Sequence, residues 1–223
     1  MRVAAVLPVK RFGRAKQRLG GALGGGERRE LAAAMVADVL AALGAVGAID
    51  ALMVVTAEPV AAEAAERAGA TVVHDPSEHG QSAAAARGIA ALGPGVDRVL
   101  LVPGDCPALA PEEVAGLLER PAADPGVVIV PDRHGSGTNA LLLTPPGAIE
   151  PSFGPGSFAR HAATARAAGA HVSVAELPSL ALDVDTPDDL AALRSALARL
   201  PGRAPRTRAV LERLRPAGLS ATA

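Results

Sequence analysis

The order of apolar and polar residues along the chain predicts alternating strands and helices. Short apolar runs between Pro, Gly or charged residues predict buried strands, and apolar residues three or four positions apart predict helices. The predicted strands are Arg2–Val9, Ala51–Thr56, Ala70–His74, Arg98–Val102, Val127–Val130, Asn139–Thr144, His171–Ala175 and Leu180–Val184. The predicted helices are Glu27–Leu43, Pro59–Ala68, Gln81–Leu92, Pro111–Leu118, Phe158–Ala168 and Pro187–Leu200.

This alternation predicts the fold class. Strands that are apolar on both faces and alternate with helices are typical of an α/β fold with a mainly parallel sheet. We expect a single domain over residues 1–200, with a core of Ala, Val and Leu that lets the helices pack close to the sheet. From Pro201 onward the chain is rich in Pro and Arg, which predicts a mobile tail over residues 201–223, with one helical turn around Val210–Leu214.

Composition narrows the class of ligand. With three Phe, no Trp and no Tyr, the chain lacks the aromatic platforms on which single-stranded nucleic acids stack. No apolar run approaches the roughly 20 residues that span a bilayer, and the first apolar run meets Lys10 too early for a secretory signal. The single Cys excludes a disulfide framework. We therefore expect a cytoplasmic protein without nucleic-acid or membrane partners, which binds its ligand through backbone groups and charge.

The loop after Val9 is strongly basic. It lies where a parallel sheet binds ligands, but it has neither the Gly-rich dinucleotide motif nor the Walker motif. Five cations crowd into residues 10–18, and an anion such as a triphosphate would relieve their repulsion. The alternative is a solvated basic loop, and the run Gly24-Gly25-Gly26 is interpreted as a flexible connection. The cations are Lys10, Arg11, Arg14, Lys16 and Arg18.

Two later loops supply carboxylates. Asp105 follows a predicted strand directly, and Asp183 and Asp185 are spaced to share one face of another, so together they predict a divalent-cation site. The alternative for Asp105 is the cap of a turn. Thr186 is explained as a helix N-cap, and Cys106 as a small buried residue rather than a nucleophile.

Two segments rich in Gly and Ser are candidate anion sites. Thr138 and Asn139 end the first, and Gly154 and Ser157 belong to the second, which opens a predicted helix. Hydroxyls and free backbone amides at such positions suit a carboxylate or phosphate, although turn chemistry explains them equally well. The five His residues show no metal-ligand spacing, and we expect each of them at the surface or in a loop.

These motifs occur together in an order that resembles a known enzyme family. They are Pro8-x-Lys10, Ala15-Lys16-x-Arg18-Leu19, Pro103-Gly104-Asp105-Cys106-Pro107, Gly137-Thr138-Asn139, Phe153-Gly154-Pro155-Gly156-Ser157-Phe158-x-x-His161 and Asp183-Val184-Asp185-Thr186-Pro187. The chain resembles the guanylyltransferases that act on 2-phospho-L-lactate or phosphoenolpyruvate in the biosynthesis of the deazaflavin coenzyme factor 420. The resemblance covers about residues 1–200.

The resemblance implies a fold and a reaction. The fold is the three-layer α/β/α, Rossmann-like fold of nucleotide-diphospho-sugar transferases, with GTP in the amino-terminal half and the phosphorylated acid in the carboxyl-terminal half. The reaction transfers GMP from GTP to phosphoenolpyruvate and yields enolpyruvoyl-diphosphoguanosine and pyrophosphate. Phosphoenolpyruvate is favoured because the Ala-, Arg- and Gly-rich composition is typical of GC-rich bacteria, where the family is expected to use it.

The resemblance also implies roles for individual residues. Three cations neutralise the triphosphate and the departing pyrophosphate, and three acids hold Mg²⁺. One departure concerns the nucleotide: Gly80-Gln81-Ser82 replaces the family's usual Gly-Leu-Asn, which leaves small polar groups such as Ser82 to read the guanine. The cations are Lys10, Lys16 and Arg18, the acids are Asp105, Asp183 and Asp185, the other nucleotide contacts are Pro8, Gly80 and Ser82, and the acceptor contacts are Thr138, Gly154, Ser157 and Asn139.

Other interpretations remain open at this point. The acceptor is alternatively 2-phospho-L-lactate or 3-phosphoglycerate, and the enzyme is alternatively a nucleotidyltransferase that uses another nucleoside triphosphate. Outside enzymes, a nucleotide-sensing α/β module is the alternative. A homodimer is one of the oligomeric states that the sequence leaves open.

Overall fold

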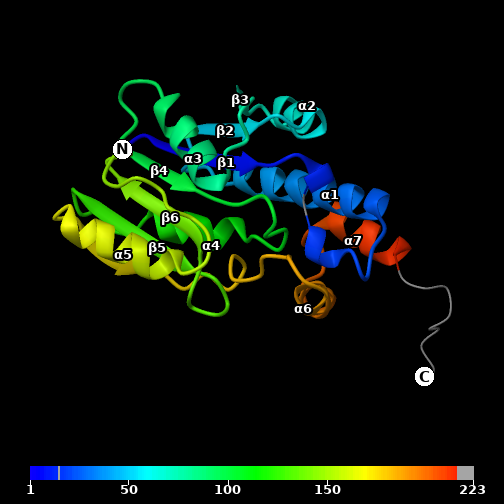
Figure 1. Ribbon diagram of the computed structural model, residues 1–223. Coiled ribbons are helices and arrows are strands. Elements are labelled where there is room, and N and C mark those ends of the chain that lie inside the picture. The colour runs from blue at the N-terminus through cyan, green and yellow to red at the C-terminus, as the bar shows by residue number, and fades with distance from the viewer. Residues whose placement is uncertain (15, 215–223) are drawn as a thin grey trace.

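The computed structural model describes residues 1–14 and 16–214, and its elements follow the predicted order (Figure 1). No helix in this part of the chain is long and apolar enough to cross a bilayer. The strands are β1 (Val3–Val9), β2 (Ala51–Thr56), β3 (Thr71–His74), β4 (Arg98–Leu101), β5 (Gly126–Pro131), β6 (Thr138–Thr144) and β7 (His171–Val174). The helices are α1 (Gly25–Gly44), α2 (Pro59–Arg67), α3 (Gln81–Ala90), α4 (Pro111–Leu118), α5 (Ser157–Ala167), α6 (Pro187–Arg199) and α7 (Pro205–Arg213), with 3-10 turns η1 (Phe12–Arg14) and η2 (Gln17–Leu19).

The strands form one mixed sheet in the order β3-β2-β1-β4-β6-β5-β7. The pairs β1–β2, β1–β4, β2–β3 and β5–β7 are parallel, whereas β6 runs antiparallel to both β4 and β5. The predicted α/β class with a mainly parallel sheet is confirmed. Because β1, β2, β3 and β4 all run the same way, their carboxyl ends meet at one edge, which is where such sheets bind ligands.

Apolar side chains on the two faces of the sheet build two separate cores. Leu7 packs in the cluster that joins the sheet to α1, α2 and α4, while the adjacent Val6 packs on the opposite face with α3 and α5. This alternation is the two-residue period of a strand buried on both sides. The predicted three-layer arrangement is therefore confirmed, and Ala, Val and Leu dominate its core as expected.

One predicted strand is wrong. Leu180–Val184 is irregular, although Leu180 and Val184 are fully buried. The segment crosses the ends of other elements instead of pairing along a strand: Val184 N donates to Asp105 O at 3.2 Å, and Leu180 O accepts from Asn139 Nδ2 at 2.7 Å. Leu180 joins the core cluster between the sheet and α1, and Val184 joins the cluster that α1 forms with α6 and α7, so burial alone did not make the segment a strand.

The interpretation of Gly24-Gly25-Gly26 as a flexible connection is also wrong. Gly25 and Gly26 form the first turn of α1, and Gly24 is its N-cap. The carboxylate of Glu27 accepts a hydrogen bond from Gly24 N at 2.6 Å, which completes the amino end of the helix. This contact explains why the glycines are helical.

The segment after Pro201 contains a helix of nine residues where one turn was expected. Val210 and Leu211 of α7 are buried in a third apolar cluster with residues of α1 and α6, and Figure 1 shows α7 beside α1. Asp38 on α1 accepts hydrogen bonds from Thr207 N at 2.7 Å and from Arg206 N at 3.2 Å, and so caps α7. Up to residue 214, the segment predicted as a tail packs on the domain, and residues 215–223 lie outside the described part.

The close packing of α3 on the sheet yields a stability prediction. A Cβ on Gly88 of α3 would lie 2.9 Å from Val55 Cγ2 and closer still to Val6. We expect Gly88→Ala to lower the free energy of unfolding by about 1–3 kcal/mol, measured by urea denaturation. The control is Gly116→Ala in α4, where a Cβ meets nothing within 4 Å and the exchange should stabilise the helix by up to about 1 kcal/mol. Equal stability of the Gly88→Ala variant and the unmodified chain would contradict this packing.

Candidate active site

A cavity of about 370 Å³ opens at the carboxyl ends of β1, β3 and β4. Its wall brings together most residues that the sequence assigns to the nucleotide and the metal, although they lie far apart in the chain. These are Pro8, Lys10, Lys16, Arg18, Gly80, Asp105 and Asp185. Of the remaining assigned residues, Ser82, Asp183, Thr138, Asn139, Gly154 and Ser157 do not line it.

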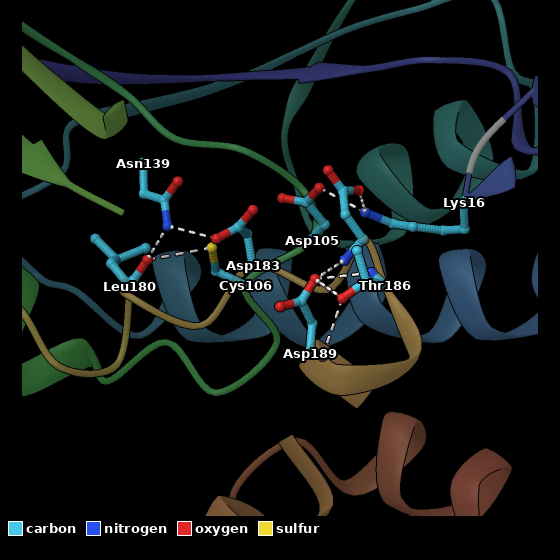
Figure 2. A network of polar contacts seen from close by, with 9 residues as sticks. Lys16, Asp105, Cys106, Asn139, Leu180, Asp183, Thr186 and Asp189 are labelled. Atoms are coloured by element: carbon cyan, nitrogen blue, oxygen red, sulfur yellow. Dashed lines mark hydrogen bonds and ion pairs between the residues drawn. The ribbon is translucent and has the colours of Figure 1, made fainter. Parts of the chain in front are cut away.

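At the centre of the site, Lys16 lies between two carboxylates. Its Nζ donates to Asp105 Oδ2 at 2.6 Å and to Asp185 Oδ1 at 2.9 Å, and Figure 2 shows its side chain reaching toward Asp105. The Lys16 side chain is only 6% exposed, although it comes from a basic loop. Burial by itself lowers the pKa of Lys16, but the charges of Asp105 and Asp185 outweigh it and raise this pKa above its ordinary value. Lys16 therefore remains positive throughout the physiological pH range.

One carboxylate oxygen of Asp105 has no partner among the described residues and could bind a cation. Its Oδ1 is buried and has no hydrogen-bond partner in the described part of the chain. An unpaired buried carboxylate oxygen is costly, and a cation is its natural partner. Within the described residues, 1–14 and 16–214, however, no group of three Asp, Glu, His or Cys side chains is arranged so that it could hold a metal ion.

Asp183 lies beside Asp105, but one of its oxygens is bound by Asn139. Its Oδ1 accepts a hydrogen bond from Asn139 Nδ2 at 3.1 Å, and the segment that carries it is not a strand, so the expected shared face with Asp185 is absent (Figure 2). Burial and the nearby charge of Asp105 raise the pKa of Asp183, against the opposing hydrogen bond from Asn139. In the geometry of this structure, Asp183 connects the acidic segment to β6.

The start of α6 positions Asp185. Thr186 is the N-cap, as predicted, and its hydroxyl accepts from Asp189 N at 3.2 Å. The carboxylate of Asp189 accepts in return from Thr186 N at 2.7 Å and from Asp185 N at 3.0 Å. This capping box holds the backbone of Asp185 in place, so its side chain is left for Lys16 and the cavity.

The candidate acceptor residues form a second cluster beside the first. Thr138 Oγ1 lies 3.0 Å from His161 Nδ1, and Ser152 N donates to His161 Nε2 at 2.8 Å. Because Nε2 accepts, the ring proton lies on Nδ1 and donates to Thr138, whose own hydroxyl hydrogen is then free for another acceptor. Ser157 Oγ is buried and has no partner among the described residues, and Gly154 is exposed with a φ of +114°.

Two hydrogen bonds connect this cluster with the rest of the site. Asn139, which follows Thr138, donates to Asp183 as described above. Phe153 N donates to Ser82 Oγ at 2.8 Å, so this hydroxyl accepts from the loop before α5 and keeps its own hydrogen to donate. Cys106 is fully buried, its Sγ contacts Leu180 O at 3.4 Å, and burial together with Asp105 raises its pKa, as suits a buried residue rather than a nucleophile.

The sequence reasoning missed three residues of this region. His161 was expected at the surface or in a loop, but it lies in α5 with no exposed surface. Asp75 and Glu78 line the cavity after β3 and were not singled out. The available signal for the two acids was their position after a predicted strand at the ligand-binding edge.

Comparison with known proteins agrees with this arrangement. Residues 3–215 match the family model described as guanylyl transferase CofC like, which extends beyond residue 200, where we expected the resemblance to end. The chain is 52% identical to a phosphoenolpyruvate guanylyltransferase of Conexibacter woesei over 96% of this chain and 97% of that protein. It is 36% identical to a 2-phospho-L-lactate guanylyltransferase of Methanothermobacter thermautotrophicus, over 85% and 83% of the two chains.

A solved structure confirms the fold family. A putative nucleotide-diphospho-sugar transferase from Desulfovibrio desulfuricans superposes with a TM-score of 0.75 at 20% identity, over 96% of this chain and 95% of that one. The predicted nucleotide-diphospho-sugar-transferase-like fold is therefore confirmed.

The burial of His161 predicts a pH dependence of stability. Burial, aided by the charge of Arg160, lowers the pKa of His161 from its ordinary value to about 4. The unfolded chain therefore binds this proton more readily, so the stabilisation is complete above pH 6.5 and disappears as the pH falls to about 4. Over this pH range the free energy of unfolding therefore decreases by an amount on the order of 3 kcal/mol. We expect urea unfolding between pH 7 and pH 4 to show a smaller loss for His161→Asn than for the unmodified chain, and parallel pH profiles would contradict the assignment.

Proposed function

Because this chain belongs to the CofC-like guanylyl transferase family, we propose that it transfers GMP from GTP to phosphoenolpyruvate and releases pyrophosphate. It is a nucleotidyltransferase by family membership, and the relative that shares 52% identity is named for the phosphoenolpyruvate reaction. The observation that carries the proposal is the cavity in which Lys16, Asp105 and Asp185 meet at the edge of the sheet. The product, enolpyruvoyl-diphosphoguanosine, would serve the biosynthesis of factor 420 in the cytoplasm, where GTP is available.

The reaction needs charge neutralisation more than proton transfer. A phosphate oxygen of the acceptor is already ionised at neutral pH, so it attacks the α-phosphorus of GTP without a general base. Lys10, Lys16 and Arg18 line the cavity and would neutralise the triphosphate and the departing pyrophosphate. Lys16 suits this role because it remains charged while almost fully buried.

The acids fit a magnesium ion. Mg²⁺ is usually bound by one or two carboxylates together with substrate phosphates and water, so a preformed set of three ligands is not required. Asp105, with its unpaired Oδ1, and Asp185 would hold it, while Asp183 supports the site through Asn139. When bound, the ion supplies Lewis-acid stabilisation of negative charge on the phosphates.

The acceptor would bind on the Thr138 side of the site. The free hydroxyl hydrogen of Thr138 is a donor for a carboxylate or phosphate oxygen, and the unpaired hydroxyl of Ser157 is a second one. Gly154, at a φ accessible mainly to glycine, offers its backbone beside them. Asn139 links this cluster to Asp183, so the acceptor phosphate would lie next to the acids that bind the metal.

The substrates are tested by crossing nucleotides with acceptors. We expect pyrophosphate release with GTP and phosphoenolpyruvate in the presence of Mg²⁺, measured in a coupled assay on the purified chain. ATP, CTP and UTP are tested in parallel, each with phosphoenolpyruvate, 2-phospho-L-lactate and 3-phosphoglycerate. Turnover only with 2-phospho-L-lactate would shift the acceptor to that of the Methanothermobacter relative, and GTP binding without any product would leave a nucleotide sensor instead of an enzyme.

The role of Asp105 is tested by Asp105→Asn. The amide keeps the shape of the side chain but removes its charge, so we expect kcat to fall by about 100-fold or more at saturating Mg²⁺, with the fold retained by circular dichroism. The matched control is Asp188→Asn, because Asp188 is an exposed acid in the first turn of α6 and does not line the cavity. Unaltered turnover of Asp105→Asn would remove Asp105 from the metal site.

A further inference from the structure

The cavity has an acidic wall that the proposed chemistry does not use. Asp75 and Glu78 follow β3 and line the same space as Lys10 and Lys16, where they would repel phosphate groups. Glu78 is paired with Arg11 at 3.0 Å. Asp75 is only 7% exposed, and a carboxylate so deeply buried is stabilised by groups that donate hydrogen bonds to it.

Only one oxygen of the Asp75 carboxylate, Oδ1, has partners within the described residues. Its Oδ1 accepts from Ser77 Oγ at 3.2 Å and lies 3.3 Å from Arg87 Nε. Arg87 also donates to Ser77 Oγ at 3.3 Å, so the three side chains brace one another. A carboxylate offers about four acceptor positions, two on each oxygen. Those of Oδ2 have no partner within the described residues, so Oδ2 is the oxygen available to a ligand.

The order of charges along the sheet edge fits the polarity of a nucleotide. Asp105 follows β4, Lys10 follows β1, and Asp75 follows β3, with β2 between β1 and β3. Since neighbouring strands lie about 4.8 Å apart, Asp75 lies roughly 10 Å along the sheet from Lys10, on the side away from Asp105. A triphosphate bound by the cations of the loop after β1, next to Asp105, would leave the β3 side of the cavity, with Asp75, for its base.

We propose that Asp75 selects guanine, with Oδ2 accepting hydrogen bonds from N1–H and the 2-amino group of the base. This inference rests on the proposed use of GTP and names the residue that reads its base. Adenine presents an acceptor at N1 and no amino group at C2, so a carboxylate at this position disfavours it. Ser82, the candidate from the sequence, does not line the cavity.

The substitution Asp75→Asn replaces a hydrogen-bond acceptor by a donor at the position that would contact the base. Ser77 and Arg87 donate toward Oδ1, so the amide oxygen of the variant is held there and its NH₂ group takes the position of Oδ2. That NH₂ group opposes the donors of guanine but complements xanthine, which has a carbonyl at C2. We expect GTP to bind the variant about 10- to 100-fold more weakly and XTP to bind it more tightly than GTP does.

Binding of GTP, ITP and XTP is measured by calorimetry with the full chain and Mg²⁺, and kcat/KM is measured by pyrophosphate release. ITP, which lacks the 2-amino group, should bind the unmodified chain more weakly than GTP and lose this disadvantage in Asp75→Asn. Glu78→Gln is the matched control: it removes a charge from the same wall and should keep the preference for GTP over XTP. Ratios between nucleotides are internal to each variant, so they do not depend on the folded fraction.

One result would overturn the inference: ratios between GTP, ITP and XTP in Asp75→Asn equal to those of the unmodified chain. If all three affinities fall by the same factor, the ratios are unchanged in this way and the loss places Asp75 on the ribose or the loop instead of the base. Failure of the proposed function is distinguishable, because it appears as nucleotide binding without product in the unmodified chain. The binding ratios decide the role of Asp75 in that case as well.

Discussion

Burial of the Lys16 ammonium group beside Asp105 and Asp185 joins three segments that lie far apart in the chain. Asp105 is 89 residues and Asp185 is 169 residues from Lys16. Removing such charges from water costs several kcal/mol each, and only close pairing offsets this cost. The loop after β1, the loop after β4 and the segment before α6 must therefore arrive at one point. The parallel strands and the capping box of α6 hold them there.

Charge replaces aromatic stacking throughout the site. Of the three Phe residues, Phe12 is buried in the cavity wall, while Phe153 meets the ring of His161 edge-on, with centroids 5.2 Å apart. The Phe153–His161 contact packs the segment before α5 against that helix. The cavity consequently has a cationic part near β1 and an acidic part near β3, and a ligand with anionic and donor ends matches both.

Local patterns predicted well what depends on neighbours in the chain. The bounds of β2 match the predicted strand, and Thr186 caps α6 as expected, because strand periodicity and capping are set within a few residues. The strand predicted over Leu180–Val184 is absent because an apolar run becomes a strand only beside a strand whose edge is free to pair. The prediction that His161 lies at the surface or in a loop was wrong because its burial depends on Thr138, which is 23 residues away on β6.

The sequence by itself determined the order of elements, the class of fold and the edge at which Lys16 and Asp105 lie, since all of these follow from periodicity and from the direction of parallel strands. Only the tertiary structure decided which atoms pair: Asp185 with Lys16, Asp183 with Asn139, and one oxygen of Asp75 with Ser77. The physical reason is that a hydrogen bond depends on distances of tenths of an ångström between segments. Such distances are set by the packing of the whole sheet and its helices, and no local pattern encodes them.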